Sequence, residues 1–155
     1  MFVIRLPNGN LKVPYTATDG RIIGDVYVEV GPQDADYARL AEQSGFDEAL
    51  LTGPDGLISE GSTTNIGFFD GTSVVWPAAA MLAGVTMQLV AARLALPQRH
   101  SAVRVADLGT FEAVFITNSH GVAAVTEVDH RQLPVDTAFI ATLKGGYESV
   151  PWDEI

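Results

Sequence analysis

The chain has 155 residues, 47% of them hydrophobic, which is enough for one folded domain with a buried core. Its 19 acidic and 9 basic residues give a net charge of -10, which disfavours binding to nucleic acid or anionic membranes. It contains no cysteine, so disulfides, thiolate chemistry and cysteine-based zinc sites are excluded. We find no apolar run of membrane-spanning length and expect no signal peptide. We therefore expect a cytoplasmic protein without a metal site, whose partner is a small molecule or another protein.

The first 31 residues predict a β-rich segment. Asn8-Gly9 and Asp19-Gly20 lie between short β-prone runs, a pattern typical of tight hairpins. A short helix is expected from Asp34 to Ser44, where apolar residues recur at helical spacing and Gly45 follows as a C-cap.

A denser series of strands is predicted after Phe46. Turn residues at Pro54-Asp55-Gly56 and Asp70-Gly71 separate short apolar runs. The expected strands are 48–51, 57–59, 65–69, 74–77, 102–105, 113–117 and 122–128.

Two helices are predicted in the same region. One is expected from Thr86 to Leu96, before Pro97, and the other from an Asp136 cap to about Tyr147. Asp107 is expected to be the N-cap of a short turn. Together these elements predict an α+β fold, with mostly local antiparallel strand pairs and the helices on one side.

Three polar segments interrupt the apolar pattern. In Glu60-Gly61-Ser62-Thr63-Thr64-Asn65, a carboxylate at a strand end is followed by a glycine and by hydroxyl and amide groups. An isolated glutamate at such a place could also face solvent without a role. Gly84-Val85-Thr86 lies at the start of the predicted 86–96 helix, where free N–H groups and a hydroxyl favour an anion. Capping alone would also explain these helix-start residues.

The third polar segment is Thr117-Asn118-Ser119-His120-Gly121, which lies between two apolar strands. It is either a polar hairpin loop or a second hydroxyl and amide cluster that meets the same anion. His120 has no metal-ligand partner at a telling spacing, so we expect no ligand role for it.

In this order and spacing, the three segments resemble the larger, C-terminal domain of the class IV aminotransferases. These are the fold-type IV pyridoxal-phosphate enzymes, which include branched-chain aminotransferase, D-amino acid aminotransferase and aminodeoxychorismate lyase. The acid-Gly-Ser/Thr-x-x-Asn run is the most diagnostic part of the resemblance. The resemblance implies an antiparallel-rich sheet or pseudo-barrel with flanking helices over residues 45–155. Residues 1–44 do not resemble the family and are expected to form a β-rich segment with a short helix.

The resemblance also implies pyridoxal 5'-phosphate as the cofactor. An acid at the place of Glu60 binds the pyridine nitrogen and keeps the ring protonated. The amides of Val85 and Thr86, with the Thr86 hydroxyl, hold the phosphate, and Thr117 and Ser119 complete the phosphate site. Asn65, also placed in the cofactor site, is expected to order the bend after Glu60.

The family's catalytic lysine, which forms a Schiff base with the cofactor, has no counterpart at the expected spacing near Val26. The chain has two lysines, Lys12 and Lys144. Lys12 is a candidate only if the connection to the domain is longer, and Lys144 is expected at a solvated helix end. The smaller N-terminal domain of the family is also not recognised, so we expect a truncated family member.

Three readings of function follow. The chain is an aminotransferase-like protein with transamination or lyase chemistry on amino acids by ancestry, incomplete without the lysine and the small domain. Alternatively, it is a catalytically silent domain that binds a cofactor or a phosphate-bearing metabolite, or pairs with a family member. A third reading is an acidic interaction module without a ligand. The resemblance implies a homodimer and does not select a substrate.

Overall fold

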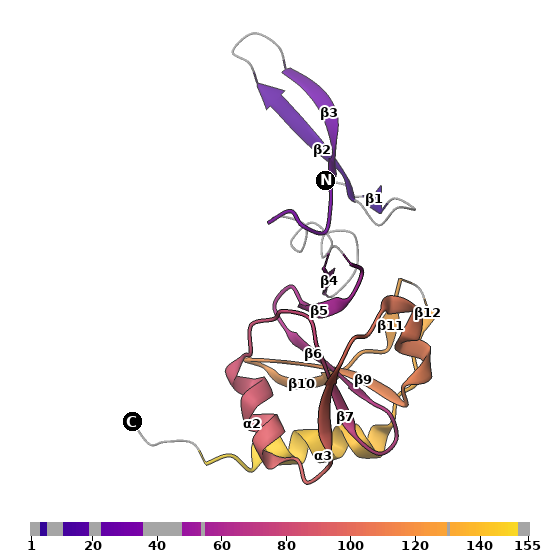
Figure 1. The fold of residues 1–155 in the computed structure, drawn as a ribbon. Coiled ribbons are helices and arrows are strands. Elements are labelled where there is room, and N and C mark those ends of the chain that lie inside the picture. Colours follow the sequence, from indigo (N-terminus) through magenta and orange to yellow (C-terminus); the bar gives the residue numbers. More distant parts are fainter. Residues whose placement is uncertain are drawn as a thin grey trace. The chain divides into compact units, whose positions relative to one another are not determined.

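The computed structural model describes residues 4–5, 11–18, 23–35, 48–53, 55–129 and 131–151, with side chains described from residue 31 onward. The chain divides into two compact units, Met1–Leu51 and Thr52–Ile155 (Figure 1). Each unit is described by itself.

The first unit contains a three-stranded antiparallel sheet. Its strands are β1 (Ile4–Arg5), β2 (Leu11–Thr18) and β3 (Ile23–Val30), in the order β1-β2-β3. β2 and β3 pair along their full length, from Leu11 opposite Val30 to Thr18 opposite Ile23. Where they fall within the described residues, the β-prone runs of this segment are therefore strands, as predicted. The predicted turns at 8–9 and 19–20 lie outside the described residues, and so does the predicted helix 34–44 from residue 36 onward.

The second unit is built on a five-stranded sheet in the order β10-β9-β6-β7-β8. Three of its neighbouring pairs are antiparallel, and β7 and β8 are parallel. β4 (Leu50–Thr52) spans the boundary between the units. The other strands are β5 (Ile58–Gly61), β6 (Asn65–Phe69), β7 (Val74–Pro77), β8 (Gln98–Ser101), β9 (Ala113–Asn118), β10 (Gly121–Ala124), β11 (Glu127–Val128) and β12 (Arg131–Gln132). The α+β class and the antiparallel-rich sheet with flanking helices are confirmed.

The helices of this unit are α2 (Val85–Arg93), the 3-10 helix η1 (Val105–Thr110) and α3 (Thr137–Glu148). α3 begins as predicted, because the Asp136 carboxylate accepts a hydrogen bond of 2.9 Å from the Phe139 amide. α2 connects the parallel strands β7 and β8, so the three elements form a β-α-β crossover.

The predicted strand at 102–105 is wrong. The strand beside β7 is instead β8, whose residues Gln98–Ser101 are polar and mostly exposed at the sheet edge. Its sequence lacks the apolar alternation that marks a half-buried strand. Arg104 is the N-cap of η1, and Asp107 caps from within the helix by accepting a hydrogen bond from the Arg104 amide at 2.9 Å. The predicted single strand 122–128 is divided between β10 and β11, which pairs with β12.

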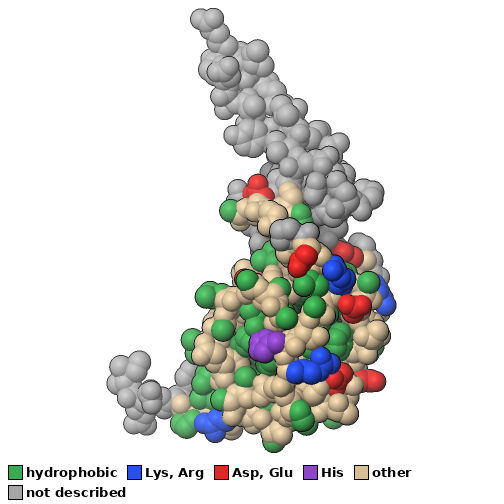
Figure 2. Space-filling model, in the orientation of Figure 1, with side chains coloured by type: hydrophobic (Ala, Val, Ile, Leu, Met, Phe, Trp, Pro, Cys, Tyr) green, Lys and Arg blue, Asp and Glu red, His purple; other side chains and the backbone are tan. Residues whose placement is uncertain are grey.

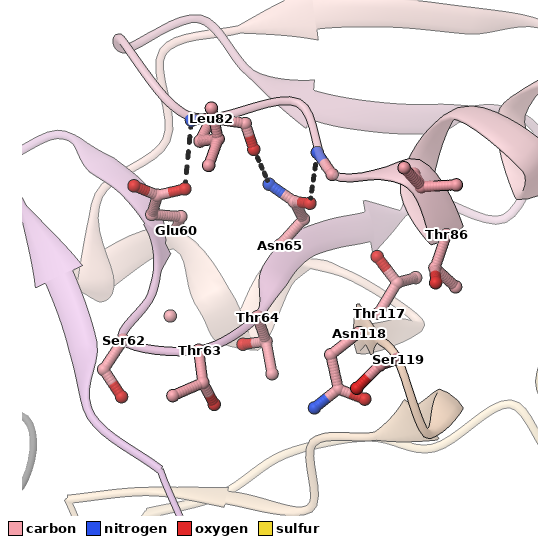
Figure 3. Close-up of a pocket in the computed structure, with 13 residues that line it drawn as sticks. Glu60, Ser62, Thr63, Thr64, Asn65, Leu82, Thr86, Thr117, Asn118 and Ser119 are labelled. Atoms are coloured by element: carbon pink, nitrogen blue, oxygen red, sulfur yellow. Dashed lines mark hydrogen bonds between the residues drawn. The ribbon is translucent and has the colours of Figure 1, made fainter.

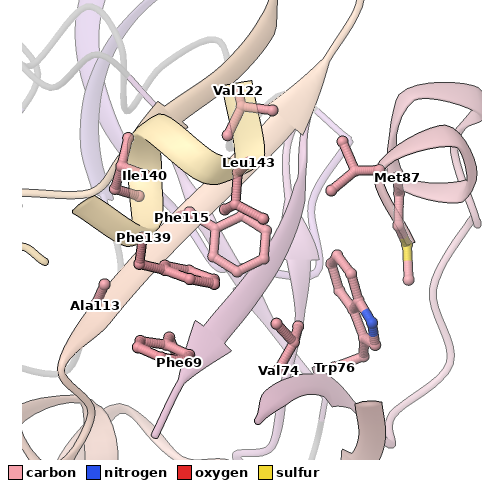
Figure 4. Close-up of a cluster of buried hydrophobic side chains, with 11 residues drawn as sticks. Phe69, Val74, Trp76, Met87, Ala113, Phe115, Val122, Phe139, Ile140 and Leu143 are labelled. Atoms are coloured by element: carbon pink, nitrogen blue, oxygen red, sulfur yellow. The ribbon is translucent and has the colours of Figure 1, made fainter. Parts of the chain in front are cut away.

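The two α-helices share a buried cluster with one face of the sheet (Figure 4). On this face, alternate residues of β6 and β9 stand opposite one another: Phe69 with Ala113 and, next, Gly67 with Phe115. A Cβ at Gly67 would overlap the Phe115 and Trp76 rings, so the glycine gives these aromatic side chains their space. The cluster also contains Val74, Met87, Val90, Val122, Phe139, Ile140 and Leu143.

The surface of the second unit carries charges of both signs. On the face shown in Figure 2, several of the described acidic and basic side chains lie near one another, and no broad basic patch is visible. Within the described residues, no helix has the length and apolar character needed to cross a membrane.

Candidate functional site

The sheet topology brings three chain segments to the same end of the strands. The crossover places the N-terminus of α2 beyond the carboxyl end of β7. Since β6 is antiparallel to both β7 and β9, its first residue lies at the same end of the sheet as the last residues of β9. Asn65 and Thr117 are opposite one another there, so the helix-covered face changes from apolar to polar at this end.

A pocket of about 400 Å³ opens at this end of the sheet (Figure 3). All six predicted cofactor-binding residues line it, namely Glu60, Asn65, Val85, Thr86, Thr117 and Ser119. Other polar side chains from the same segments, including Ser62, Thr63, Thr64 and Asn118, also line it. The structure therefore joins the three polar segments that are separate in the sequence.

The N-terminus of α2 forms one wall of the pocket. Its N-cap is Gly84, which provides no side-chain cap, and its first turn contains no acidic residue. The first intrahelical bond is donated by Gln88 to the Gly84 carbonyl, so the amides of the preceding residues have no helical acceptor. The buried side chain of Thr86 lies at this end, while that of Val85 is exposed. Such a helix end is chemically suited to an anion.

Two buried hydroxyl groups in the pocket have no hydrogen-bond partner among the described residues. They are the Oγ1 atoms of Thr117 and Thr64, whose side chains are 2% and 6% exposed. A buried hydroxyl without a partner destabilises the folded state, and native proteins contain few such groups. In Figure 3, Thr117 lies between Asn65 and Thr86, beside the start of α2. The Thr117 hydroxyl is thus a buried hydrogen-bonding group without a partner that lies beside the helix end.

Glu60 and Asn65 both hold the loop that precedes α2. The Leu82 amide donates to Glu60 Oε2 at 3.1 Å, and the Asn65 amide nitrogen donates to the Leu82 carbonyl at 2.7 Å. The Gly84 amide donates to Asn65 Oδ1 at 3.0 Å. Within the described part of the chain, Glu60 Oε1 has no hydrogen-bond partner. This oxygen can therefore accept a hydrogen bond from a ligand.

The bend after Glu60 is closed by the backbone, through a 2.8 Å bond from the Gly61 amide to the Thr64 carbonyl. The carboxamide of Asn65 bonds to the loop before α2. Its expected role in ordering the bend stays a prediction. Leu82 contributes through its peptide group and not its side chain, so no side-chain pattern in the sequence indicates these contacts. The partnerless hydroxyl of Thr64 was missed because burial, not residue type, distinguishes it from its neighbours.

Neither lysine is among the described pocket residues. Lys12 lies in β2 opposite Glu29, and its side chain is outside the described set. Lys144 is exposed on α3. His120 is exposed, and its amide donates to Asn118 Oδ1 at 2.9 Å. No group of three or more His, Asp or Glu side chains is placed to hold a metal in the described ranges.

Several solved structures share this fold. A fold IV-transaminase from Curtobacterium pusillum is 25% identical, with a TM-score of 0.65 over 79% of this chain and 45% of its own. An aminotransferase from Brucella abortus bound to PLP is 25% identical, with a TM-score of 0.63 over 72% of this chain and 41% of its own. A branched-chain aminotransferase from the archaeon Thermoproteus uzoniensis, with norvaline, is 21% identical, with a TM-score of 0.66 over 74% and 40%.

The chain therefore spans less than half the length of these three proteins. A search of curated proteins returned no match. The family model described as amino-transferase class IV matches residues 35–128. Since that match covers more than half of the 155 residues, the chain belongs to the class IV aminotransferase family.

Proposed function

We propose that this chain is a pyridoxal-phosphate-binding domain of the class IV aminotransferase type that holds its cofactor without a covalent bond. The observation that carries the proposal is the partnerless Thr117 hydroxyl, buried beside the uncapped N-terminus of α2 in a pocket that also contains Glu60. This combination fits a ligand with a phosphate at one end and a cationic ring at the other.

The phosphate end of the site would be formed by α2 and β9. The amides of Val85 and Thr86 and the Thr86 hydroxyl would donate to phosphate oxygens at the positive end of the helix. Thr117 would donate the hydroxyl hydrogen that has no acceptor in the described structure, and Ser119 would close the site from the β9–β10 turn. The missing acid in the first turn of α2 keeps this end free of a competing negative charge.

The acid end of the site would be formed by Glu60. Its Oε2 is oriented by the Leu82 amide, and Oε1 would accept a hydrogen bond from a protonated ring nitrogen. When bound, pyridoxal phosphate withdraws electrons from the α-carbon of an attached amino acid, and a protonated ring strengthens that withdrawal. The contribution of Glu60 is thus to hold a proton on the ring.

No described residue of the pocket is a lysine, and this supports non-covalent binding. Transamination or lyase chemistry on amino acids is then the ancestry of the domain, and we propose that this chain alone does not turn substrate over. We further propose that it associates with a second copy of itself or with another family member.

Titration of the chain with pyridoxal phosphate, followed by absorbance and by calorimetry, tests the proposal. We expect saturable binding that dialysis reverses, and no covalent adduct after borohydride reduction. Glu60→Ala and Thr117→Val should each weaken binding, while Thr110→Val, outside the pocket, should not. A borohydride-stable adduct mapped to Lys12 would overturn the non-covalent proposal, and absence of saturable binding would overturn cofactor binding itself.

A further inference from the structure

The loop Leu82–Gly84 is fixed by side chains from two different strands. Glu60 of β5 accepts from the Leu82 amide, while Asn65 of β6 donates to the carbonyl of the same residue. Asn65 also accepts from the Gly84 amide, so its carboxamide uses a donor and an acceptor on one loop (Figure 3). Hydrogen bonds therefore hold the loop from two places, from Glu60 at the acid end of the pocket and from Asn65 at the start of β6.

The absence of a side chain at Gly84 makes room for the Asn65 carboxamide and its hydrogen bonds to the loop. A Cβ built at Gly84 would lie 2.6 Å from Asn65 Oδ1, closer than a real Cβ approaches an oxygen. The backbone of Gly84 has φ -66° and ψ 154°, a conformation open to any residue. Among the described residues beyond its chain neighbours, Asn65 supplies the only heavy atoms within 4 Å of that Cβ position. The need for glycine here is thus steric and comes from one side chain.

We propose that Asn65 is a positioning residue that joins the two ends of the pocket into a single unit. Gly84 is the N-cap of α2, so its position determines where the amides of Val85 and Thr86 point. Leu82, held by the same carboxamide, orients the Glu60 carboxylate. This inference rests on the proposed function for its ligand, a phosphate monoester on a cationic ring, but the contacts can be tested without that ligand.

A double-mutant cycle between Asn65 and Gly84 tests whether Asn65 holds the loop. The chain, Asn65→Ala, Gly84→Ala and the double variant are titrated with pyridoxal phosphate and with inorganic phosphate. We expect Asn65→Ala and Gly84→Ala each to lower the affinity for both ligands roughly tenfold, because each variant loses hydrogen bonds to the loop. In the Asn65→Ala background, Gly84→Ala should change affinity by less than about twofold, because its steric conflict is gone. An equal effect of Gly84→Ala in both backgrounds would overturn the proposal.

The link to the acid end is tested with two uncharged replacements of Glu60. Glu60→Gln keeps an acceptor for the Leu82 amide, whereas Glu60→Ala removes it. Loss of charge alone should raise the affinity for inorganic phosphate equally in both variants. We expect Glu60→Ala to bind phosphate several-fold more weakly than Glu60→Gln, because only the alanine variant releases the loop. Equal phosphate affinities in the two variants would show that the ends are independent.

Amide hydrogen exchange in the ligand-free chain separates this inference from the proposed function. Asn65→Ala should accelerate exchange of the Gly84 amide, and Glu60→Ala that of the Leu82 amide, each with little change in the β9 amides. If no phosphate ligand binds the unaltered chain, the proposed function fails, while the exchange rates still decide whether Asn65 fixes the loop. If the ligands bind normally and Gly84 exchange is unchanged in Asn65→Ala, the positioning role fails alone.

Discussion

Thr117 combines deep burial with a hydroxyl that has no partner within the described structure. Its neighbours two and four residues earlier on the same strand face, Phe115 and Ala113, are core residues. A threonine at this place therefore lowers the stability of the ligand-free fold relative to an apolar residue of the same shape. Thr110 offers a contrast, because its hydroxyl donates to the Asp107 carbonyl at 2.7 Å.

Replacement of Thr117 by valine should have opposite effects on stability and binding. We expect the unfolding free energy of the ligand-free chain to rise by about 1 kcal/mol, since an unsatisfied hydroxyl is removed without a cavity. The affinity for pyridoxal phosphate should fall about tenfold, because one phosphate donor is lost. Urea unfolding and calorimetric titration measure the two effects. Thr110→Val is the matched control and should lower stability without changing affinity, and a Thr117→Val variant with lower stability would contradict the prediction.

At the level of elements, the start of α2 is left without electrostatic compensation. No acid lies in its first turn, and Gly84 provides no side-chain cap. Helices with this composition gain stability when a negative charge is placed near their first residues. Val85 is the first helical residue, and its side chain is 72% exposed, so a change there does not disturb the core.

We therefore expect Val85→Glu to stabilise the ligand-free chain by about 0.3–1 kcal/mol and to weaken phosphate binding, since the new carboxylate competes with the anion. Val85→Gln, with the same shape and no charge, is the control. Thermal unfolding and phosphate titration at low and high salt distinguish the two variants. If Val85→Glu bound phosphate as tightly as Val85→Gln, the anion would not lie at this helix end.

The turn between β6 and β7 depends on Asp70. Its pKa lies well below the usual range, chiefly because the Ser73 hydroxyl and then the Ser73 and Thr72 amides donate to the carboxylate. Arg99 forms an ion pair with it at 3.2 Å, but this arginine is 51% exposed and adds little.

The contribution of the Asp70 charge should depend on pH. Since its pKa is lower in the folded state, the stabilisation is present above the unfolded value of 3.8 and is lost as pH falls through the folded value. Asp70→Asn should therefore be less stable than the unaltered chain by a constant amount from about pH 5 upward, with the difference shrinking below about pH 4. Urea unfolding across this range measures the difference. Arg99→Gln should show no such trend, and a pH-independent difference for Asp70→Asn would contradict the prediction.

The sequence predicted some elements closely and others not at all. β6 and β7 have the predicted bounds, because apolar runs are separated by the Asp70-Gly71 turn. β8 was missed, because a polar edge strand held by a parallel partner leaves no periodic pattern. At the pocket, residue types indicated Glu60 and Thr86. The role of Leu82 depends on backbone hydrogen bonds between distant segments, which no local pattern contains.

At the scale of the whole molecule, the second unit has its own hydrophobic core. Leu143 of α3 is fully buried in the cluster that joins both α-helices to the sheet, together with Trp76 and Phe115. The unit thus builds its pocket on a packed core, although the chain spans less than half of its structural relatives.

Leu143→Ala should lower the unfolding free energy by about 2–5 kcal/mol, because it leaves a cavity beneath the sheet. Leu82→Ala removes the same atoms from a side chain that is 80% exposed and should change stability by less than about 0.5 kcal/mol. Denaturant unfolding followed by tryptophan fluorescence reports the difference, since Trp76 lies in the core. Similar losses in the two variants would mean that this cluster does not stabilise the fold.

The partnerless hydroxyl of Thr117 also has an evolutionary consequence. Mutations that stabilise a fold are tolerated wherever function does not oppose them. A lineage that had abandoned its ligand would gain stability by replacing Thr117 with an aliphatic residue, so drift would tend to erase the threonine. Among relatives of this chain, the residue at this position therefore offers a simple marker that separates those that bind a ligand from those that have lost it.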